Sequence, residues 1–341
     1  MFSRLPQAQV EECLRFDHLK HRGTEITEVI RKSEFTAEYR EDTEAKRQRE
    51  LIKNLIAVRV YHRVFGTRSY TFFMGVIMRP WILAETTHSH TKTHQYEVAV
   101  LPLGATEPHN LHLPYGMDMM EGTIVGEKIC AAAHQQGANV ILLPTIPYGT
   151  QTNMYKMPLA MNLDPSTLNQ VVKDLIQSLI LSGIRKILLL NSHGGNEMKP
   201  LLRELCGRTE AHVFLCNWYK AFTDKYAEIF EYPDDHAGEM ETSFAMAFYP
   251  ELIARKPDGA LAADDGTKAK SRFEAVNEGW VSITRPWHLL TTNAGAGYPH
   301  KASAEKGRKM MDLLVERLAT FLVELSDSPL DERFPFETTR G

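Results

Sequence analysis

The sequence has few cysteines, no long apolar run and no excess of positive charge. Its four cysteines, Cys13, Cys130, Cys206 and Cys216, are scattered and form no CxxC pair, which favours buried thiols in a reducing cytoplasm over a disulfide framework or zinc knuckle. No window approaches the ~20 apolar residues of a transmembrane helix, and no secretory signal is evident. A net charge of -4 gives no electrostatic case for nucleic acid. We therefore expect neither a membrane nor nucleic acid as a partner.

Residues 1–77 differ in composition from the rest of the chain. The stretch 1–50 is rich in charge and poor in apolar periodicity, and 44–64 could form a basic helix without a motif. Met78 opens a stretch typical of the beginning of a domain. We interpret 1–77 as an N-terminal extension, either disordered or upstream of the true start codon; an accessory segment for association is the alternative. This leaves 78–325 as one domain and 326–341 as a polar C-terminal tail.

From Tyr96 onward, apolar runs alternate with stretches of helical periodicity. Strands are predicted at 97–103, 139–143, 187–190 and 212–216, and helices at 119–136, 165–182, 197–206, 238–248 and 301–325. This alternation predicts an α/β fold with a mostly parallel sheet and helices on both of its faces. In such folds the ligand site lies outside the carboxyl ends of the strands.

The first group of candidate site residues follows the predicted strand 97–103. A span of twelve positions there contains four acidic or imidazole side chains: Glu107, His109, His112 and Asp118. Asp118 can offer one carboxylate oxygen to each of two metal ions that lie ~3.5–4 Å apart. The alternative is a loop of polar groups that satisfy one another, but acids and imidazoles at two strand ends favour a metal site.

The second group follows the predicted strand 187–190, so it can meet the first at the sheet edge. His193 would add a nitrogen ligand, while Gly194 and Gly195 let backbone approach a ligand closely. The helix after Asn196 presents N–H groups to an anion; a tight strand-to-helix turn would explain the same residues. Carboxylates and imidazoles without thiolates suit Zn²⁺, Mn²⁺ or Fe²⁺.

A third group lies at 234–243. His236 could shuttle a proton between the attacking water and the leaving nitrogen. Glu239 or Glu241 could complete the metal coordination, and the other acid would then only stabilise the first turn of a helix. A further histidine-rich stretch, at His88, His90 and His94, is typical of a solvated loop, with metal binding as its alternative.

These groups resemble the motifs of the creatininase family of metal-dependent amidohydrolases. Glu107–Asp118 matches E-x-H-G-x-H-L-P-x-x-x-D except for Asn110, and Asn191–Asn196 resembles N-G-H-G-G-N with Ser192 in place of glycine. His236–Ser243 resembles H-A-G-x-x-E-T-S, and Gly297–Gly307 resembles a closing G-x-P-x-x-A-S-x-E-K-G. The four motifs occur in the family's order and span about 78–325.

The resemblance implies a three-layer α/β/α sandwich, a hexamer, and two divalent metal ions, Zn or Mn with Fe as a third candidate, that activate water. Carried over by position, Glu107 and His193 would bind one ion, His109 would bind the other, and Asp118 would bridge them. His236 occupies the proton-transfer position. The expected activity is hydrolysis of carbon–nitrogen bonds other than peptide bonds, by a cytoplasmic homo-oligomer.

Three departures from the family pattern bear on the substrate. Creatininase has a glutamate ligand where this chain has Gly195, so we expect the second ion to use another group, such as Glu241, or to bind more weakly. Asn110 replaces a usual glycine, and the loop 150–154 lacks a histidine that many members carry. We therefore expect a small cyclic amide or formamide other than creatinine as substrate. A peptide-trimming hydrolase of cofactor maturation and an inactive ligand-binding or scaffold relative are the alternatives.

The site residues expected from the sequence fall into three sets. The catalytic set is His236 and Glu239; the metal ligands are Glu107, His109, Asp118, His193 and Glu241; the substrate-binding set is Tyr148, Gly194 and Gly195.

Overall fold

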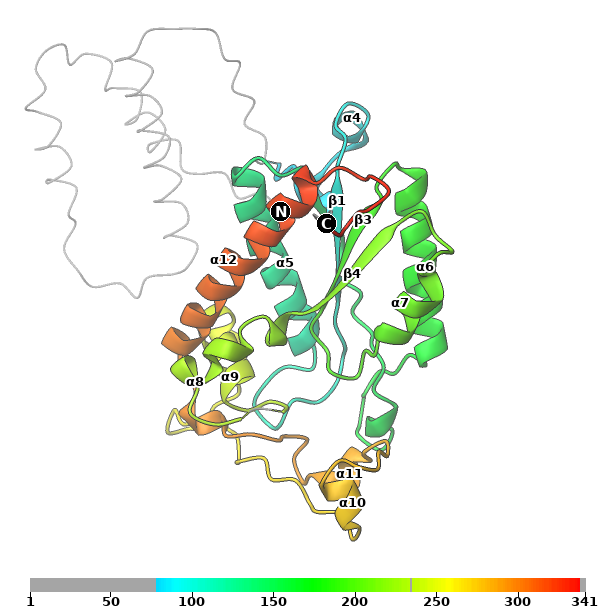
Figure 1. The fold of residues 1–341 in the computed structure, drawn as a ribbon. Helices are drawn as coiled ribbons and strands as arrows, with labels where there is room; N and C mark the ends of the chain where they lie inside the picture. Colours follow the sequence, from blue (N-terminus) through cyan, green and yellow to red (C-terminus); the bar gives the residue numbers. More distant parts are fainter. Residues whose placement is uncertain (1–77, 234, 338–341) are drawn as a thin grey trace, which may run out of the picture. The chain divides into compact units, whose positions relative to one another are not determined.

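The structure is a computed structural model, and it describes residues 78–233 and 235–337 (Figure 1). The extension predicted at 1–77 lies outside the described residues. Within the described part, no helix is both long enough and apolar enough to cross a membrane.

Four parallel strands form the sheet, in the order β2-β1-β3-β4. The strands are β1 (Val98–Leu103), β2 (Val140–Leu142), β3 (Lys186–Asn191) and β4 (His212–Asn217). The register pairs Leu103 with Asn191 and Asn191 with Asn217, so these three strands end at the same level. The predicted parallel sheet is confirmed, and the loops after β1 and β3 begin side by side.

Alternate residues of the strands face two separate cores. Val98 and Val100 belong to one core, whereas Ala99, Leu101 and Leu103 belong to the other. A parallel strand covered on both faces reads as a continuous apolar run, as β1 does. The sheet is therefore the middle of three layers, as the resemblance implied.

The longer helices divide between the two faces of the sheet (Figure 1). One face carries α5 (Met117–Gln135), α9 (Glu239–Phe248) and α12 (Ala304–Asp327); the other carries α6 (Pro165–Leu181) and α7 (Lys199–Leu205). The short helices are α4 (His88–Thr91), α8 (Tyr226–Ile229), α10 (Glu274–Asn277) and α11 (Trp287–Leu290). Single turns of 3₁₀ helix occur at Leu83–Glu85, Thr152–Met154, Trp218–Lys220, Thr223–Lys225, Pro250–Leu252 and Pro299–Lys301.

The last helix, α12, begins later and ends later than its apolar pattern predicts. Its N-cap is Ser303, whose hydroxyl accepts a hydrogen bond from the Lys306 N–H at 3.2 Å. At the other end Ser326 is buried and hydrogen-bonded: its Oγ accepts from the Asn139 N–H at 3.0 Å, and its carbonyl accepts from Lys186 Nζ at 3.0 Å. The first residues of the predicted tail are therefore helical and tied to the sheet.

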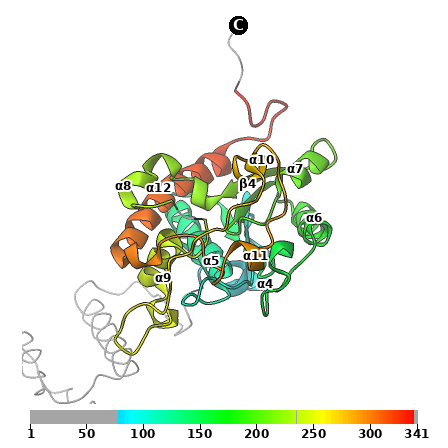
Figure 2. The same cartoon turned by 90° about the horizontal axis from the view of Figure 1, so that it is seen from below.

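The segment 263–298, which we call the arm, carries α10 and α11. Figure 1 shows α10 and α11 below the sheet, beyond the carboxyl ends of the strands, and the view from below shows α11 in front of the sheet (Figure 2). The sequence gives no periodic pattern for this segment. The arm makes one wall of the site described next.

Candidate metal centre

The loop between β1 and α5 is held in shape by Asn110. This residue has a φ of 54°, in the left-handed region that asparagine tolerates better than most residues. Its Nδ2 donates to the Asp264 carbonyl at 2.9 Å, and its Oδ1 accepts from the Leu111 N–H at 2.7 Å. Asn110 can thus occupy a position where the family motif usually has glycine, and it ties the loop to the arm.

Six candidate side chains converge at the carboxyl end of the sheet, and each is between 0 and 8% exposed. They are Glu107, His109, Asp118, His193, His236 and Glu241. Two groups of three have ligand atoms within 4.8 Å of one another and share Asp118: the first adds Glu107 and His193, and the second adds His109 and Glu241. Glu107, His109 and His236 form a third such group. The arrangement offers two adjacent places for a cation, with Asp118 common to both.

Backbone carbonyls fix the orientation of all three histidines. His193 Nε2 lies 3.0 Å from the Thr150 carbonyl, and His236 Nε2 lies 2.9 Å from the Pro108 carbonyl. His109 Nδ1 lies 3.0 Å from the carbonyl of Glu107. Because a carbonyl can only accept, each of these nitrogens carries a proton, and the other nitrogen of each ring is left to face the cluster. Metal-binding histidines are commonly oriented in this way.

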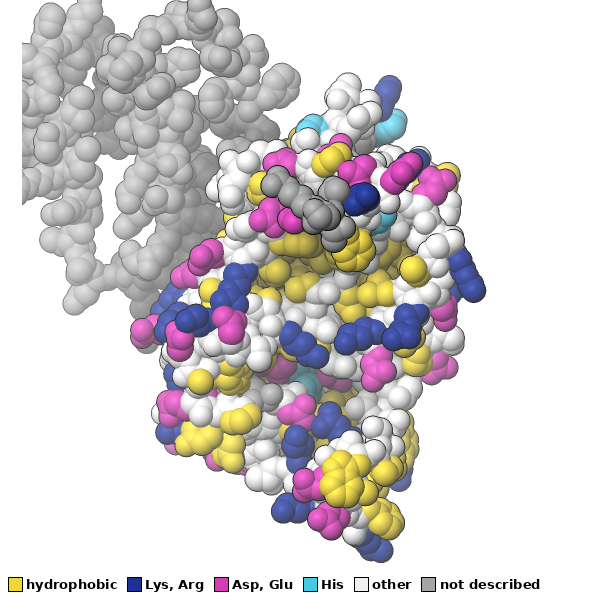
Figure 3. Space-filling model, viewed as in Figure 1, with side chains coloured by type: hydrophobic (Ala, Val, Ile, Leu, Met, Phe, Trp, Pro, Cys, Tyr) yellow, Lys and Arg dark blue, Asp and Glu magenta, His cyan; other side chains and the backbone are white. Residues whose placement is uncertain are grey.

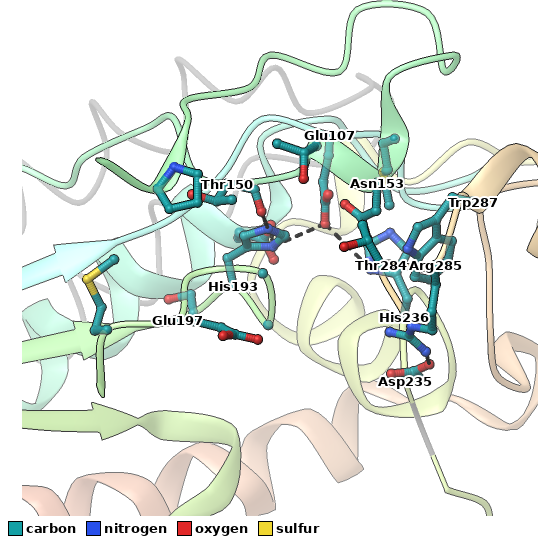
Figure 4. A pocket seen from close by; sticks show the side chains of 18 of the residues that line it. Glu107, Thr150, Asn153, His193, Glu197, Asp235, His236, Thr284, Arg285 and Trp287 are labelled. Atoms are coloured by element: carbon teal, nitrogen blue, oxygen red, sulfur yellow. Dashed lines mark hydrogen bonds and ion pairs between the residues drawn. The ribbon is translucent and has the colours of Figure 1, made fainter. Parts of the chain in front are cut away.

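The free nitrogens face the carboxylates. His193 Nδ1 lies 3.2 Å from both Glu107 Oε1 and Asp118 Oδ2, and His236 Nδ1 lies 3.8 Å from Glu107 Oε1. In Figure 4 the side chains of Glu107, His193 and His236 point toward one another, with Glu107 between the two rings. Imidazole nitrogens and carboxylate oxygens, the atoms that bind a metal, therefore meet at one place.

Three buried polar atoms of the cluster lack a hydrogen bond among the described residues: Glu107 Oε2, His109 Nε2 and Asp118 Oδ2. His109 Nε2 lies 3.4 Å from Asp118 Oδ1, and Asp118 Oδ2 lies 3.2 Å from His193 Nδ1. A buried polar atom without a partner costs about 1–3 kcal/mol. Divalent cations would satisfy all three atoms, so the residues fit a metal centre.

The electrostatics of the cluster agree with a cation site. Burial alone would lower the pKa of His109, but the Asp118 carboxylate raises it to about 10. Likewise, burial would lower the pKa of His193, but Glu107 and Asp118 raise it well above its ordinary value. The carboxylates are thus stabilised by positive charge between them. Protons on the histidines or divalent metal ions can supply this charge, and the two compete for the same sites.

His236 has the opposite tendency. Burial lowers its pKa, and the neighbouring His109 lowers it further. The ring is therefore neutral at pH 7, with its proton on Nε2. A neutral imidazole with a free nitrogen beside the cluster can accept a proton there.

The structure accounts for the departure at Gly195. A Cβ at this position would lie 2.1 Å from the Thr150 carbonyl oxygen and 2.5 Å from His193 Nε2, so no side chain fits. The space of a glutamate is taken by the carbonyl that orients His193. Glu241 instead reaches the cluster from the first turn of α9, where its carboxylate accepts from the Ala237 N–H.

The carboxylate of Glu239, which we expected to be catalytic, is bound by groups outside the cluster. Its Oε1 accepts from Lys306 Nζ at 2.5 Å, and its Oε2 accepts from the Glu231 and Tyr232 N–H groups at 2.9 and 3.0 Å. Helical geometry separates the faces of Glu239 and Glu241, so the carboxylate of Glu239 is directed to α12 instead of the cluster. Glu239 joins α9 to α12.

A cavity of about 900 Å³ opens onto the cluster. Gly194 and Gly195 line it, as expected for substrate-binding residues, but Tyr148 does not; its side chain is 45% exposed outside the cavity. The sequence reasoning missed Arg285 and Trp287, which line the cavity from the arm. They occur in a stretch without periodicity or motif, so only the fold brings them to the site.

His112 stands behind the cluster. Its Nε2 lies 2.8 Å from Thr242 Oγ1, and burial lowers its pKa to about 4. It connects the loop after β1 to α9 as a neutral ring.

Comparison with known proteins gives the same assignment along most of the domain. The family model for creatininase, described as creatinine amidohydrolase, matches residues 84–322. The creatinine amidohydrolase of Pseudomonas putida is 29% identical over 176 residues, 46% of this chain and 66% of that protein, just under two thirds of its length. The 3-dehydro-scyllo-inosose hydrolase of Thermotoga maritima is 25% identical over 257 residues, 71% of this chain and 80% of that protein. The mycofactocin precursor peptide peptidase of Mycobacterium ulcerans is 26% identical over 230 residues, 64% of this chain and 84% of that protein.

Solved structures share the fold. A protein of Bacteroides fragilis assigned as a creatinine amidohydrolase is 32% identical with a TM-score of 0.65, over 74% of this chain and 98% of that one. A creatininase described with Mn is 23% identical with a TM-score of 0.58, over 73% and 99% of the two chains. A creatininase variant described as of Zn-Zn type is 23% identical with a TM-score of 0.59, over 72% and 98%.

Proposed function

The chain belongs to the creatininase family, and from that premise we propose that it is a metal-dependent amidohydrolase acting on the C–N bond of a small cyclic amide or formamide. Its relatives are named as an amidohydrolase, a hydrolase and a peptidase, and all three names describe hydrolases, the enzyme class predicted from the sequence. The proposal is carried by the buried cluster around Asp118, whose acids and imidazoles are oriented toward a common centre.

The metal ligands proposed here follow the two groups of ligand atoms. One divalent ion would be held by Glu107 and His193, a second by His109 and Glu241, with Asp118 shared. Zn and Mn are the candidates, since creatininases with those metals have this fold. Bound there, the two ions would activate a water molecule and polarise the amide carbonyl.

His236 is proposed to move the proton. Its Nδ1 is free and lies beside Glu107, while the Pro108 carbonyl holds the Nε2 proton and the ring in place. Nδ1 would accept a proton from the attacking water and deliver it to the leaving nitrogen. The Trp287 ring lies 4.9 Å from the His236 ring, edge to face, and shields that side.

A combined metal and activity assay tests the proposal. We expect the purified full chain to hold two divalent ions and to hydrolyse at least one compound in a panel of cyclic amides and formamides. Chelation should abolish the activity, and Zn or Mn should restore it. Full activity in a metal-stripped sample would contradict the mechanism, and full metal occupancy without turnover would favour the scaffold alternative.

Peptide trimming is the second candidate, favoured by the size of the cavity. At about 900 Å³ it is at the upper end of the range for drug-sized ligands, ~300–1,000 Å³, and larger than a small cyclic amide needs. Release of terminal residues from short synthetic peptides, followed by mass spectrometry, would distinguish the candidates. Cleavage of peptides with no turnover of small amides would replace the first proposal by the second.

A homo-oligomer is also proposed, on the evidence of the arm. Phe273 and Trp280 are 69% and 77% exposed there, and exposed large apolar side chains in one region are typical of interaction surfaces. Light scattering of the full chain tests this: a multiple of the monomer mass is expected, a hexamer being the state implied by the resemblance, and a monomer would contradict it.

A further inference from the structure

Arg285 is a cavity residue that the metal chemistry does not use. It precedes α11 on the arm and lines the cavity. Its Nη1 donates to Asp235 Oδ2 at 2.8 Å, and its guanidinium carbon lies 5.6 Å from the centre of the Trp287 ring. A carboxylate and an aromatic face therefore hold the guanidinium in one place. Arginine has five N–H donors, and the hydrogen bonds found in the described part of the chain use Nη1 alone.

The charge around Arg285 is not balanced by Asp235. Asp235 Oδ2 also accepts from Lys268 Nζ at 3.0 Å, so one carboxylate faces two cations. Lys220 adds a third positive group at the cavity wall, while Glu197 lines the cavity on the far side of Glu107 (Figure 4). Lysine and arginine side chains, with some acidic ones among them, border the hollow between the arm and the sheet in the space-filling view (Figure 3). Arg285 and Lys268 together thus carry one positive charge more than the Asp235 carboxylate that they share.

Arg285 is close to the reacting centre. Its guanidinium contacts Trp287, whose ring lies 4.9 Å from His236, and His236 Nδ1 lies 3.8 Å from Glu107. A substrate whose amide faces the metal ligands could therefore extend a second group past His236 to Arg285. Planar guanidinium groups bind carboxylates through two parallel hydrogen bonds.

We propose that Arg285 determines specificity by binding a carboxylate of the substrate, so that the amide hydrolysed by this chain carries an anionic group on the side of the arm. This inference rests on the proposed function. The competing explanation is that the pair of Arg285 and Asp235 only fastens the arm to the body of the domain.

Lys268 provides a matched control for these explanations. It contacts the same oxygen of Asp235 as Arg285 does, but it does not line the cavity. If the ion pairs only fasten the arm, Arg285→Gln and Lys268→Gln should have similar effects. If Arg285 binds the substrate, Arg285→Gln alone should change the preference for an anionic ligand.

The experiment compares hydantoin-5-acetate with its uncharged analogue, hydantoin-5-acetamide. Calorimetry on the full chain loaded with Zn measures both dissociation constants. Because the two ligands share the same ring, the ratio of these constants reports only the difference between the carboxylate and the amide. We expect the acid to bind about ten- to a hundredfold more tightly than the amide, the range for a hydrogen-bonded ion pair. Arg285→Gln should remove this preference, Arg285→Lys should keep part of it, and Lys268→Gln should retain it.

Equal affinities in the wild type, no binding of the acid at millimolar concentration, or equal losses in Arg285→Gln and Lys268→Gln would each overturn the proposal. Thermal melts of each variant establish that it folds. The titrations are repeated in a His236→Ala background, which is expected to keep both ions and lose turnover, so heat from hydrolysis does not contribute. The outcome is therefore separable from the proposed function. Neutral amides hydrolysed without preference for acids would remove the inference and leave the function standing.

Discussion

Two histidine-rich regions of this chain look alike in sequence and differ in structure. One is the cluster around Asp118, and the other is α4 with His90 and His94. The rings of His90 and His94 stack at 5.1 Å, and His90 Nε2 is buried without a hydrogen bond, as His109 Nε2 is. Within the described residues, however, none of the histidines at α4 forms an ion pair with a carboxylate. Burial and the neighbouring imidazoles His90 and His134 lower the pKa of His94.

The difference shows what makes a histidine a candidate ligand. An orphaned ring nitrogen occurs in both regions. The cluster adds carboxylates that attract a cation, backbone carbonyls that fix the protonated nitrogen, and a place at the carboxyl ends of parallel strands. Variants in each region can break or sharpen this contrast.

The largest effect is expected from Asp118→Asn. Asp118 is shared by both groups of ligand atoms, so the change should release both ions and lower kcat/KM at least about a thousandfold. Metal analysis and kinetics on the purified variant measure this. Retention of both ions would show that Asp118 does not bridge them.

His236→Ala should separate catalysis from metal binding. The variant is expected to keep both ions, because the two groups around Asp118 do not need His236, and to lose about 10²–10⁴ in kcat. Elemental analysis and steady-state kinetics are the measurements. If the ions leave with the activity, His236 is a ligand and not a proton carrier.

Much of this contrast follows from the sequence, and part of it does not. The apolar runs predict all four strands, and the motifs predict the family and the residues that converge. The contact of Glu239 with Lys306 was not predictable, because a sequence cannot tell which face of α9 meets α12. Arg285 was missed because the arm has no periodic pattern, and its place depends on the tertiary path of the chain.

Glu241→Gln and Glu239→Gln form a matched pair, because both residues lie in the first turn of α9 and their carboxylates bind different groups. Glu241→Gln should remove one ion of the two and leave the site with His193, since Glu241 belongs to the second group alone. Glu239→Gln should leave both ions bound. Titration with Mn²⁺, followed by electron paramagnetic resonance, counts the sites. Loss of metal in Glu239→Gln would restore its assignment to the site.

Glu239 is expected to matter for stability instead. Glu239→Ala leaves Lys306 and two backbone N–H groups without their acceptor. Breaking a buried ion pair costs ~3–5 kcal/mol, and we expect about 3 kcal/mol because the Lys306 side chain is 22% exposed. Urea denaturation measures the free energy of unfolding; a change below about 1 kcal/mol would contradict the structural role.

The smallest effect is expected at α4. The double change His90→Ala with His94→Ala should leave the metal content and kcat/KM unchanged and alter the free energy of unfolding by about 1 kcal/mol or less. The same metal analysis and denaturation curves apply. A drop in metal content would place a ligand site at α4 and remove the contrast between the two regions.

Anomalous X-ray diffraction from crystals of the Mn-loaded chain tests the central claim most directly, because it locates the ions. The account predicts two peaks about 3.5–4 Å apart, one beside His193 and one beside Glu241, with Asp118 between them. A single peak, or peaks at the histidines of α4, would contradict it.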